Sequence, residues 1–141
     1  MKIIRVKITA ESGHVPAEYE FRDSLIITEN SIEYECSPYM PSDTNHVQSW
    51  AYRTNRPEFA RQFKLAVIAL KRFFEKTPES AYVDMPFVRF QVTDNNDTTI
   101  EKRYMINPNE YRECFACIMK MVPPSEQIPC MLQMPTDQQE E

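Results

Sequence analysis

Apolar and polar residues alternate along two short segments of the chain, 3–9 and 31–37, and this period of two is typical of half-buried β-strands. Four further segments also have the composition of strands bounded by turns or loops. In the first segment, for example, Ile4, Val6 and Ile8 alternate with basic residues. Turn-forming residues at 29–30 and 94–97 are suited to join neighbouring strands into hairpins. The predicted strands are 3–9, 19–28, 31–37, 47–54, 87–93 and 98–106.

Two other segments repeat apolar residues with the period of an α-helix. Each begins with an asparagine and a glutamate three residues later, Asn55 with Glu58 and Asn107 with Glu110, which predicts a capping box. The first predicted helix, 57–76, has an apolar stripe made of Phe59, Phe63, Ala66, Val67, Leu70 and Phe74. The second has a stripe made of Tyr111, Cys114, Phe115, Ile118, Met121 and Val122.

The order of these elements, ββββ-α-ββ-α, predicts an α+β fold. We expect an antiparallel sheet of about five or six strands, with the two amphipathic helices covering one face. The chain has 141 residues, which fits one domain; we assign that domain to 1–135 and expect 136–141 to be a loose acidic tail. The prolines at 123, 124, 129 and 135 argue against a helix, so we expect 128–134 to be extended and 128–132 to pack on the domain.

Glycine usage excludes several classes of enzyme, because Gly13 is the only glycine in the sequence. Loops that cradle phosphates with backbone N–H groups need several glycines, so Walker-type and dinucleotide-type loops are absent. The longest unbroken apolar run, 65–70, is far too short to span a bilayer, and the basic residues near the start interrupt any signal-peptide core. We therefore predict a cytoplasmic protein with no membrane contact.

The two cysteines in the C-x-x-C spacing, Cys114 and Cys117, fall in and beside the apolar stripe of the second predicted helix. A reactive pair would place its nucleophile at the start of a helix, but the predicted cap lies seven residues before Cys114. A zinc site would need further ligands from Cys36, His46 or Cys130, which form no second close pair. We predict buried, unreactive thiols, and no catalytic residue, metal or cofactor.

Charged residues are unevenly distributed. Residues 11–50 contain eight acidic side chains and one basic side chain, whereas 53–76 contain seven basic and two acidic ones. The basic residues of the first helix lie opposite its apolar stripe and surround one isoleucine, which is typical either of a binding face or of an ordinary solvated surface. The predicted partner-binding residues are Arg61, Lys64, Ile68, Lys71 and Arg72. An alternative acidic face would use Glu33 and Glu35.

These observations favour a non-catalytic protein-interaction module that binds a protein or a macromolecular complex through a charged face. Inhibitors and accessory factors encoded by phages and plasmids are similar in size and charge. The net charge of −5 argues against specific binding to nucleic acid alone. The alternative is a small-molecule- or nucleic-acid-related domain, or an enzyme, with a site between the sheet and loop 38–46. Aromatic residues that could line it are Tyr34, Tyr39, Trp50 and Tyr52.

Overall fold

The described part of the chain contains six strands and two α-helices in the predicted order, which confirms the α+β class. The computed structural model describes residues 2–11, 21–38, 48–78, 87–105, 111–126 and 128–133. The elements are β1 Ile3–Glu11, β2 Phe21–Thr28, β3 Ser31–Pro38, β4 Gln48–Arg53, α1 Pro57–Lys76, β5 Phe87–Asp94, β6 Thr99–Met105, α2 Arg112–Met119 and the 3₁₀ helix η2 Cys130–Gln133. The tail predicted at 136–141 and most of the predicted loop 38–46 lie outside the described residues.

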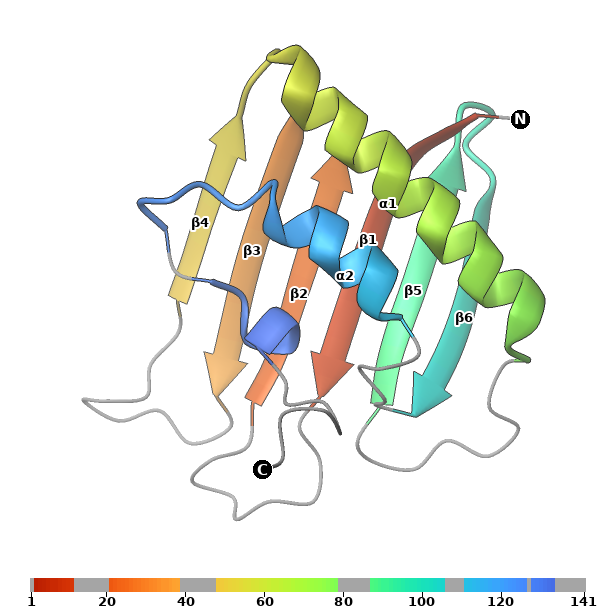
Figure 1. The fold of residues 1–141 in the computed structure, drawn as a ribbon. Coiled ribbons are helices and arrows are strands. Elements are labelled where there is room, and N and C mark those ends of the chain that lie inside the picture. The colour runs from red at the N-terminus through yellow and green to blue at the C-terminus, as the bar shows by residue number, and fades with distance from the viewer. Residues whose placement is uncertain are drawn as a thin grey trace, which may run out of the picture.

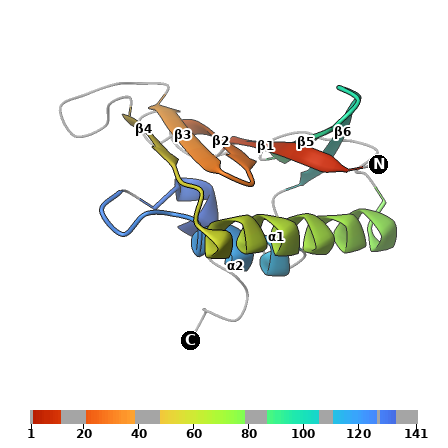
Figure 2. The ribbon, with the colours of Figure 1, turned by 90° about the horizontal axis from the view of Figure 1, so that it is seen from above.

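All six strands form one antiparallel sheet in the order β4-β3-β2-β1-β5-β6 (Figure 1). The first strand of the chain therefore lies inside the sheet, between β2 and β5. Both α-helices pack on the same face of this sheet, as the view from above shows (Figure 2). We call this the inner face and the opposite one the outer face. No helix in the described part of the chain covers the outer face.

The period-two pattern determines which side chains reach the inner face. In β1, Val6, Ile8 and Ala10 are buried beneath the helices, as the alternation predicts. Ile4 departs from the pattern, because its side chain is 39% exposed. The reason is a register shift between Ile3 and Arg5 in the pairing of β1 with β5, which changes the side of the sheet on which the first residues project.

The first helix starts at Pro57, but the predicted cap at Asn55 is wrong. Arg56 is the N-cap residue, with an extended backbone and no side-chain cap bond. Its own backbone N–H donates to the hydroxyl of Thr54 at 3.2 Å. Pro57 explains why a helix begins here without the predicted cap, because its fixed φ suits the first helical position, where a backbone N–H would have no partner.

The buried stripe of α1 differs from the predicted one at two places. Ala69 and Phe73 are buried, whereas Val67 and Phe74 are only partly buried. The Phe73 ring lies 4.5 Å from the ring of Tyr104 on β6 and 5.5 Å from that of Tyr111 next to α2, measured between centroids. Contact with α2 as well as with the sheet thus rotates the buried face of α1 toward Phe73.

The C-terminal segment packs on the domain as predicted, but it is not extended. Residues Cys130–Gln133 form a 3₁₀ turn, and the Met131 side chain is 1% exposed. The backbone N–H of Met131 donates to a carboxylate oxygen of Asp23 at 3.0 Å. Pro129 precedes this turn and accepts a bond from the Leu132 N–H at 3.0 Å, so the proline does not prevent it.

Replacing Phe73 with alanine is expected to lower the free energy of unfolding by about 3–5 kcal/mol, because it removes a ring that contacts both the sheet and α2. The matched control is Phe74→Ala, which should cost less since Phe74 is only partly buried. Chemical denaturation of both variants measures the difference. A larger loss for Phe74→Ala would contradict this assignment of the core.

Replacing Asp97 with glycine is expected to raise the free energy of unfolding by about 0.5–1 kcal/mol. Asp97 has φ 62°, the one positive φ among the described non-glycine residues, and it lies in the turn between β5 and β6. Glycine adopts this backbone without a Cβ clash. Asn96→Gly in the same turn is the control and should give no gain. Equal gains from both substitutions would contradict the argument.

Candidate binding surfaces

The outer surface of α1 exposes two large apolar side chains. Leu65 is 42% exposed and Ile68 is 46% exposed, and they lie three residues apart on the same side of the helix. Ile68 was among the predicted partner-binding residues, whereas Leu65 was not. The wheel position of Leu65 next to Arg61 and Arg72 was the signal in the sequence that could have identified it.

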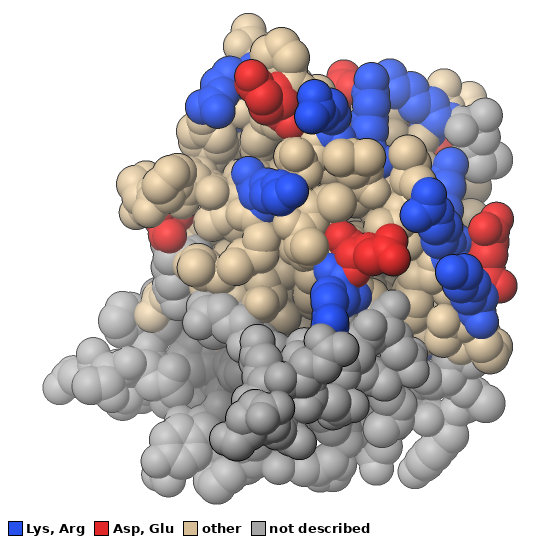
Figure 3. Space-filling view, in the orientation of Figure 1, with Lys and Arg blue, Asp and Glu red and all other residues tan. Residues whose placement is uncertain are grey.

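Three of the predicted basic residues lie next to this apolar pair. Arg61, Lys64 and Lys71 are exposed and, within the described residues, form no ion pair. Basic side chains follow the course of α1 in the space-filling view (Figure 3). We define the α1 surface as Arg61, Lys64, Leu65, Ile68 and Lys71.

Arg72 has a different environment from the other predicted cations. Its Nη1 atom lies 3.7 Å from the Oε2 atom of Glu113, at the start of α2. Arg72 therefore extends toward α2 and bridges the two helices across their solvent side. This pairing compensates its charge, so we leave Arg72 out of the α1 surface.

The alternative acidic residues, Glu33 and Glu35, lie on the other side of the molecule. Both are exposed on β3, whose intervening residues Ile32, Tyr34 and Cys36 are buried under the helices. Glu33 and Glu35 therefore project from the outer face of the sheet. The structure separates the two predicted faces by the full thickness of the sheet, so they cannot form one site.

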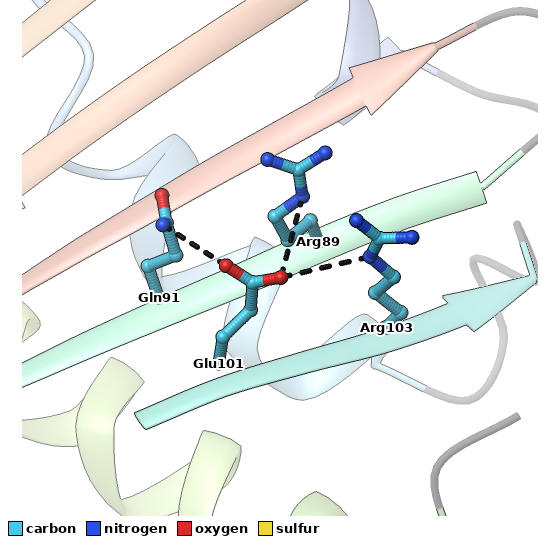
Figure 4. Close-up of polar contacts among 4 residues, drawn as sticks. All are labelled: Arg89, Gln91, Glu101 and Arg103. Atoms are coloured by element: carbon cyan, nitrogen blue, oxygen red, sulfur yellow. Dashed lines mark hydrogen bonds and ion pairs between the residues drawn. The ribbon is translucent and has the colours of Figure 1, made fainter. Parts of the chain in front are cut away.

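A second charged cluster on the outer face was missed in the sequence. Glu101 on β6 lies between two arginines: its Oε2 atom is 3.8 Å from Nε of Arg89 and 3.6 Å from Nε of Arg103 (Figure 4). Its Oε1 atom accepts a hydrogen bond from Gln91 Nε2 at 3.1 Å. The hairpin loop predicted at 94–97 sets the register of β5 and β6 and so brings these residues together. The cluster could therefore have been predicted from the sequence.

The cysteines of the C-x-x-C pair are free thiols in different environments. Cys114 is buried, and burial raises the pKa of its thiol well above the ordinary value. Burial also raises the pKa of the Cys117 thiol, which is only partly buried. Low thiol reactivity was predicted from the sequence because Cys114 would lie far from the start of the helix. That reason was wrong, because α2 starts at Arg112 and places Cys114 in its first turn. Burial nevertheless keeps the Cys114 thiol protonated, although the helix dipole favours the thiolate.

Metal ligands do not gather in the described part of the chain. There, no group of three or more histidine, cysteine, aspartate or glutamate residues is arranged to hold an ion. His46 belongs to the undescribed range 39–47, and of Cys130 only the backbone is described.

The aromatic residues proposed to line a pocket contribute mainly to the core. Tyr34 is buried, and its ring centroid lies 5.8 Å from that of Trp50. Tyr52 packs on Phe59 and also lines a pocket of about 170 Å³ between the start of α1 and 120–124. This volume is below the roughly 300–1,000 Å³ that is usual for a small-molecule site. Tyr39 lies outside the described residues, so the alternative site at loop 38–46 stays a prediction.

Comparisons with protein-family models, with curated proteins and with solved structures found no match to this chain. Within the described residues, neither helix has the length and apolar content needed to cross a lipid bilayer. The function therefore has to be inferred from the surfaces described above.

Alkylation should separate the two thiols of the C-x-x-C pair. At a pH near 8.5, where a free cysteine ionises, iodoacetamide should modify Cys117 while Cys114 stays unmodified. The physical reason is that Cys114 is both inaccessible and held protonated. Peptide mass spectrometry measures the two rates, and the unfolded protein, in which they should be equal, is the control. Faster modification of Cys114 in the native protein would contradict its buried environment.

Proposed function

We propose that this protein is a non-catalytic interaction module, an inhibitor or accessory factor that binds another protein through the α1 surface. The observation that carries the proposal is the exposed pair Leu65 and Ile68, bordered by three cations that form no ion pair with any described residue. An apolar centre with a charged rim is the arrangement found in protein interfaces. The free thiols Cys36, Cys114 and Cys117 support a reducing, cytoplasmic location.

The charge of the α1 surface specifies the chemistry of the partner. Lys64 and Lys71 lie on one side of Ile68, and Arg61 lies on the other side near Leu65, so a bound surface would face cations on both flanks. We therefore propose a partner with a small apolar patch surrounded by acidic side chains. Opposite charges would speed association and orient the complex, while burial of the apolar pair would supply affinity.

The energies involved agree with a role for both kinds of residue. Burying a leucine or isoleucine side chain completely contributes about 1.5–3 kcal/mol, and here close to half of each side chain remains to be buried. Exposed ion pairs contribute about 0–1 kcal/mol each and weaken with salt. The apolar pair would thus provide most of the affinity, and the cations would provide specificity and salt dependence.

The test is the double variant Lys64→Glu, Ile68→Ser, which reverses one charge and removes the apolar centre. We expect its affinity for the partner to fall at least tenfold, about 1.4 kcal/mol, while its free energy of unfolding changes little because both side chains are exposed. Affinity is measured by titration calorimetry with the partner that co-purifies from the native source. The affinity of the wild type should also decrease as salt is added.

A matched control uses residues that are not part of the α1 surface. Arg53→Glu with Ile100→Ser changes one exposed cation on β4 and one isoleucine, 48% exposed, on β6. This variant should bind the partner as the wild type does. If both variants keep full affinity, the α1 surface is only solvated, and the acidic residues Glu33 and Glu35 become the next surface to test.

A further inference from the structure

The charged cluster around Glu101 contains two arginines whose mutual repulsion does not favour stability. Arg89 and Arg103 lie directly opposite each other on the adjacent strands β5 and β6. Like charges in such a cross-strand pair repel and destabilise a sheet. Glu101 is the one carboxylate within ion-pair distance of either arginine among the described residues. The pair thus keeps an excess of positive charge.

An aromatic ring and a carboxylate hold the two guanidinium groups in position. Each lies over the ring of Phe87, at 5.8 Å for Arg89 and 5.7 Å for Arg103, and that ring is itself buried. Glu101 approaches both groups at their Nε atoms and is itself fixed by Gln91. Contacts of this kind reduce the entropy that the long side chains would lose on binding a ligand.

Both arginines keep hydrogen-bond donors that no described residue uses. Among the described residues, neither guanidinium group makes a hydrogen bond, and the Nε atom of Arg89 is shielded from solvent without a hydrogen-bond partner. The terminal nitrogens of both groups point away from Glu101 (Figure 4). Two guanidinium groups side by side, with free donor edges, offer the geometry that binds an oxyanion through paired hydrogen bonds.

We infer that Arg89 and Arg103 form a binding site for a single phosphate group on the outer face of the sheet. Lys7 supports this assignment, because it lies on the same face opposite Gln91 in the pairing of β1 with β5. The three cations and Glu101 leave an excess of two positive charges. A phosphate monoester carries close to two negative charges above its second pKa of about 6, so the charges balance.

The surrounding charges explain why the site fits one phosphate and not a polyanion. Glu33 and Glu35 project from the same face on β3, toward the opposite edge of the sheet. An extended nucleic acid that crossed this face would meet these carboxylates and be repelled. A carboxylate ligand carries one negative charge and only two acceptor oxygens, so it would leave one arginine uncompensated.

The experiment follows the arginine Nε–Hε signals by nuclear magnetic resonance during titration with inorganic phosphate at constant ionic strength and above the second pKa of phosphate. We expect saturable shifts at Arg89 and Arg103, with weaker binding of acetate. Arg103→Lys keeps the charge but removes the planar donor group, and it should weaken phosphate binding at least fivefold. Arg89→Lys should do the same. Arg53→Lys, on the distant edge strand β4, is the matched control and should bind as the wild type does.

Three results would overturn the site: no saturable shift of the wild type at tens of millimolar phosphate, equal binding of acetate, or unchanged affinity in Arg103→Lys. Arg103 is 45% exposed on an edge strand, so its replacement should leave the protein folded, and the amide spectrum checks this. A parallel titration with O-phosphoserine identifies the source of the phosphate. Tighter binding of phosphoserine indicates a phosphomonoester, and tighter binding of inorganic phosphate indicates the free ion.

Discussion

The packing of Phe73 between the sheet and α2 determines which surfaces this protein presents. Its ring contacts the rings of Phe90 on β5, Tyr104 on β6 and Tyr111 beside α2. A helix that is fixed at such a point cannot rotate without losing contacts to three elements. Ile68 lies on the solvent side of α1 because it is about 140° from Phe73 on the helical wheel, whereas Leu65, about 80° from Phe73, lies at the margin of that side. These contacts therefore fix the orientation of the α1 surface relative to the sheet.

A buried carboxyl group on β2 is the second constraint on the fold. Asp23 is fully buried, and one of its oxygens accepts hydrogen bonds from the Tyr34 hydroxyl at 3.1 Å and from the Met131 backbone at 3.0 Å. A buried carboxyl group without partners would be costly, so these bonds are needed to keep it inside the protein. They also attach the 3₁₀ turn to the inner face of the sheet. The C-terminal segment thus forms part of the same core as α1 and α2.

The sequence predicted the elements that depend on local patterns. Strand β3 and the turn at 94–97 were predicted because alternation and turn chemistry act over a few residues. The place of Phe74 in the stripe was not correct, since it depends on how the helix is docked, and the cap at Asn55 was not correct because the helix begins at Pro57 with Arg56 as its N-cap residue. Periodicity finds an apolar stripe but does not tell which edge of it a second helix will cover. The exposed state of Ile4 likewise depends on its partner strand β5.

The candidate sites were also predictable to different degrees, because some depend on local patterns and others on how the elements pack. The cations of α1 lie within one helix, so their common side followed from the sequence, but the ion pair of Arg72 with Glu113 required the docking of α2. The arginine pair depends on the register of two strands, which only the hairpin turn reveals. These sites lie on opposite layers, α1 on the inner side and Arg89 with Arg103 on the outer face. A protein bound at the proposed α1 surface would therefore not cover the proposed phosphate site, so the two proposals do not exclude each other.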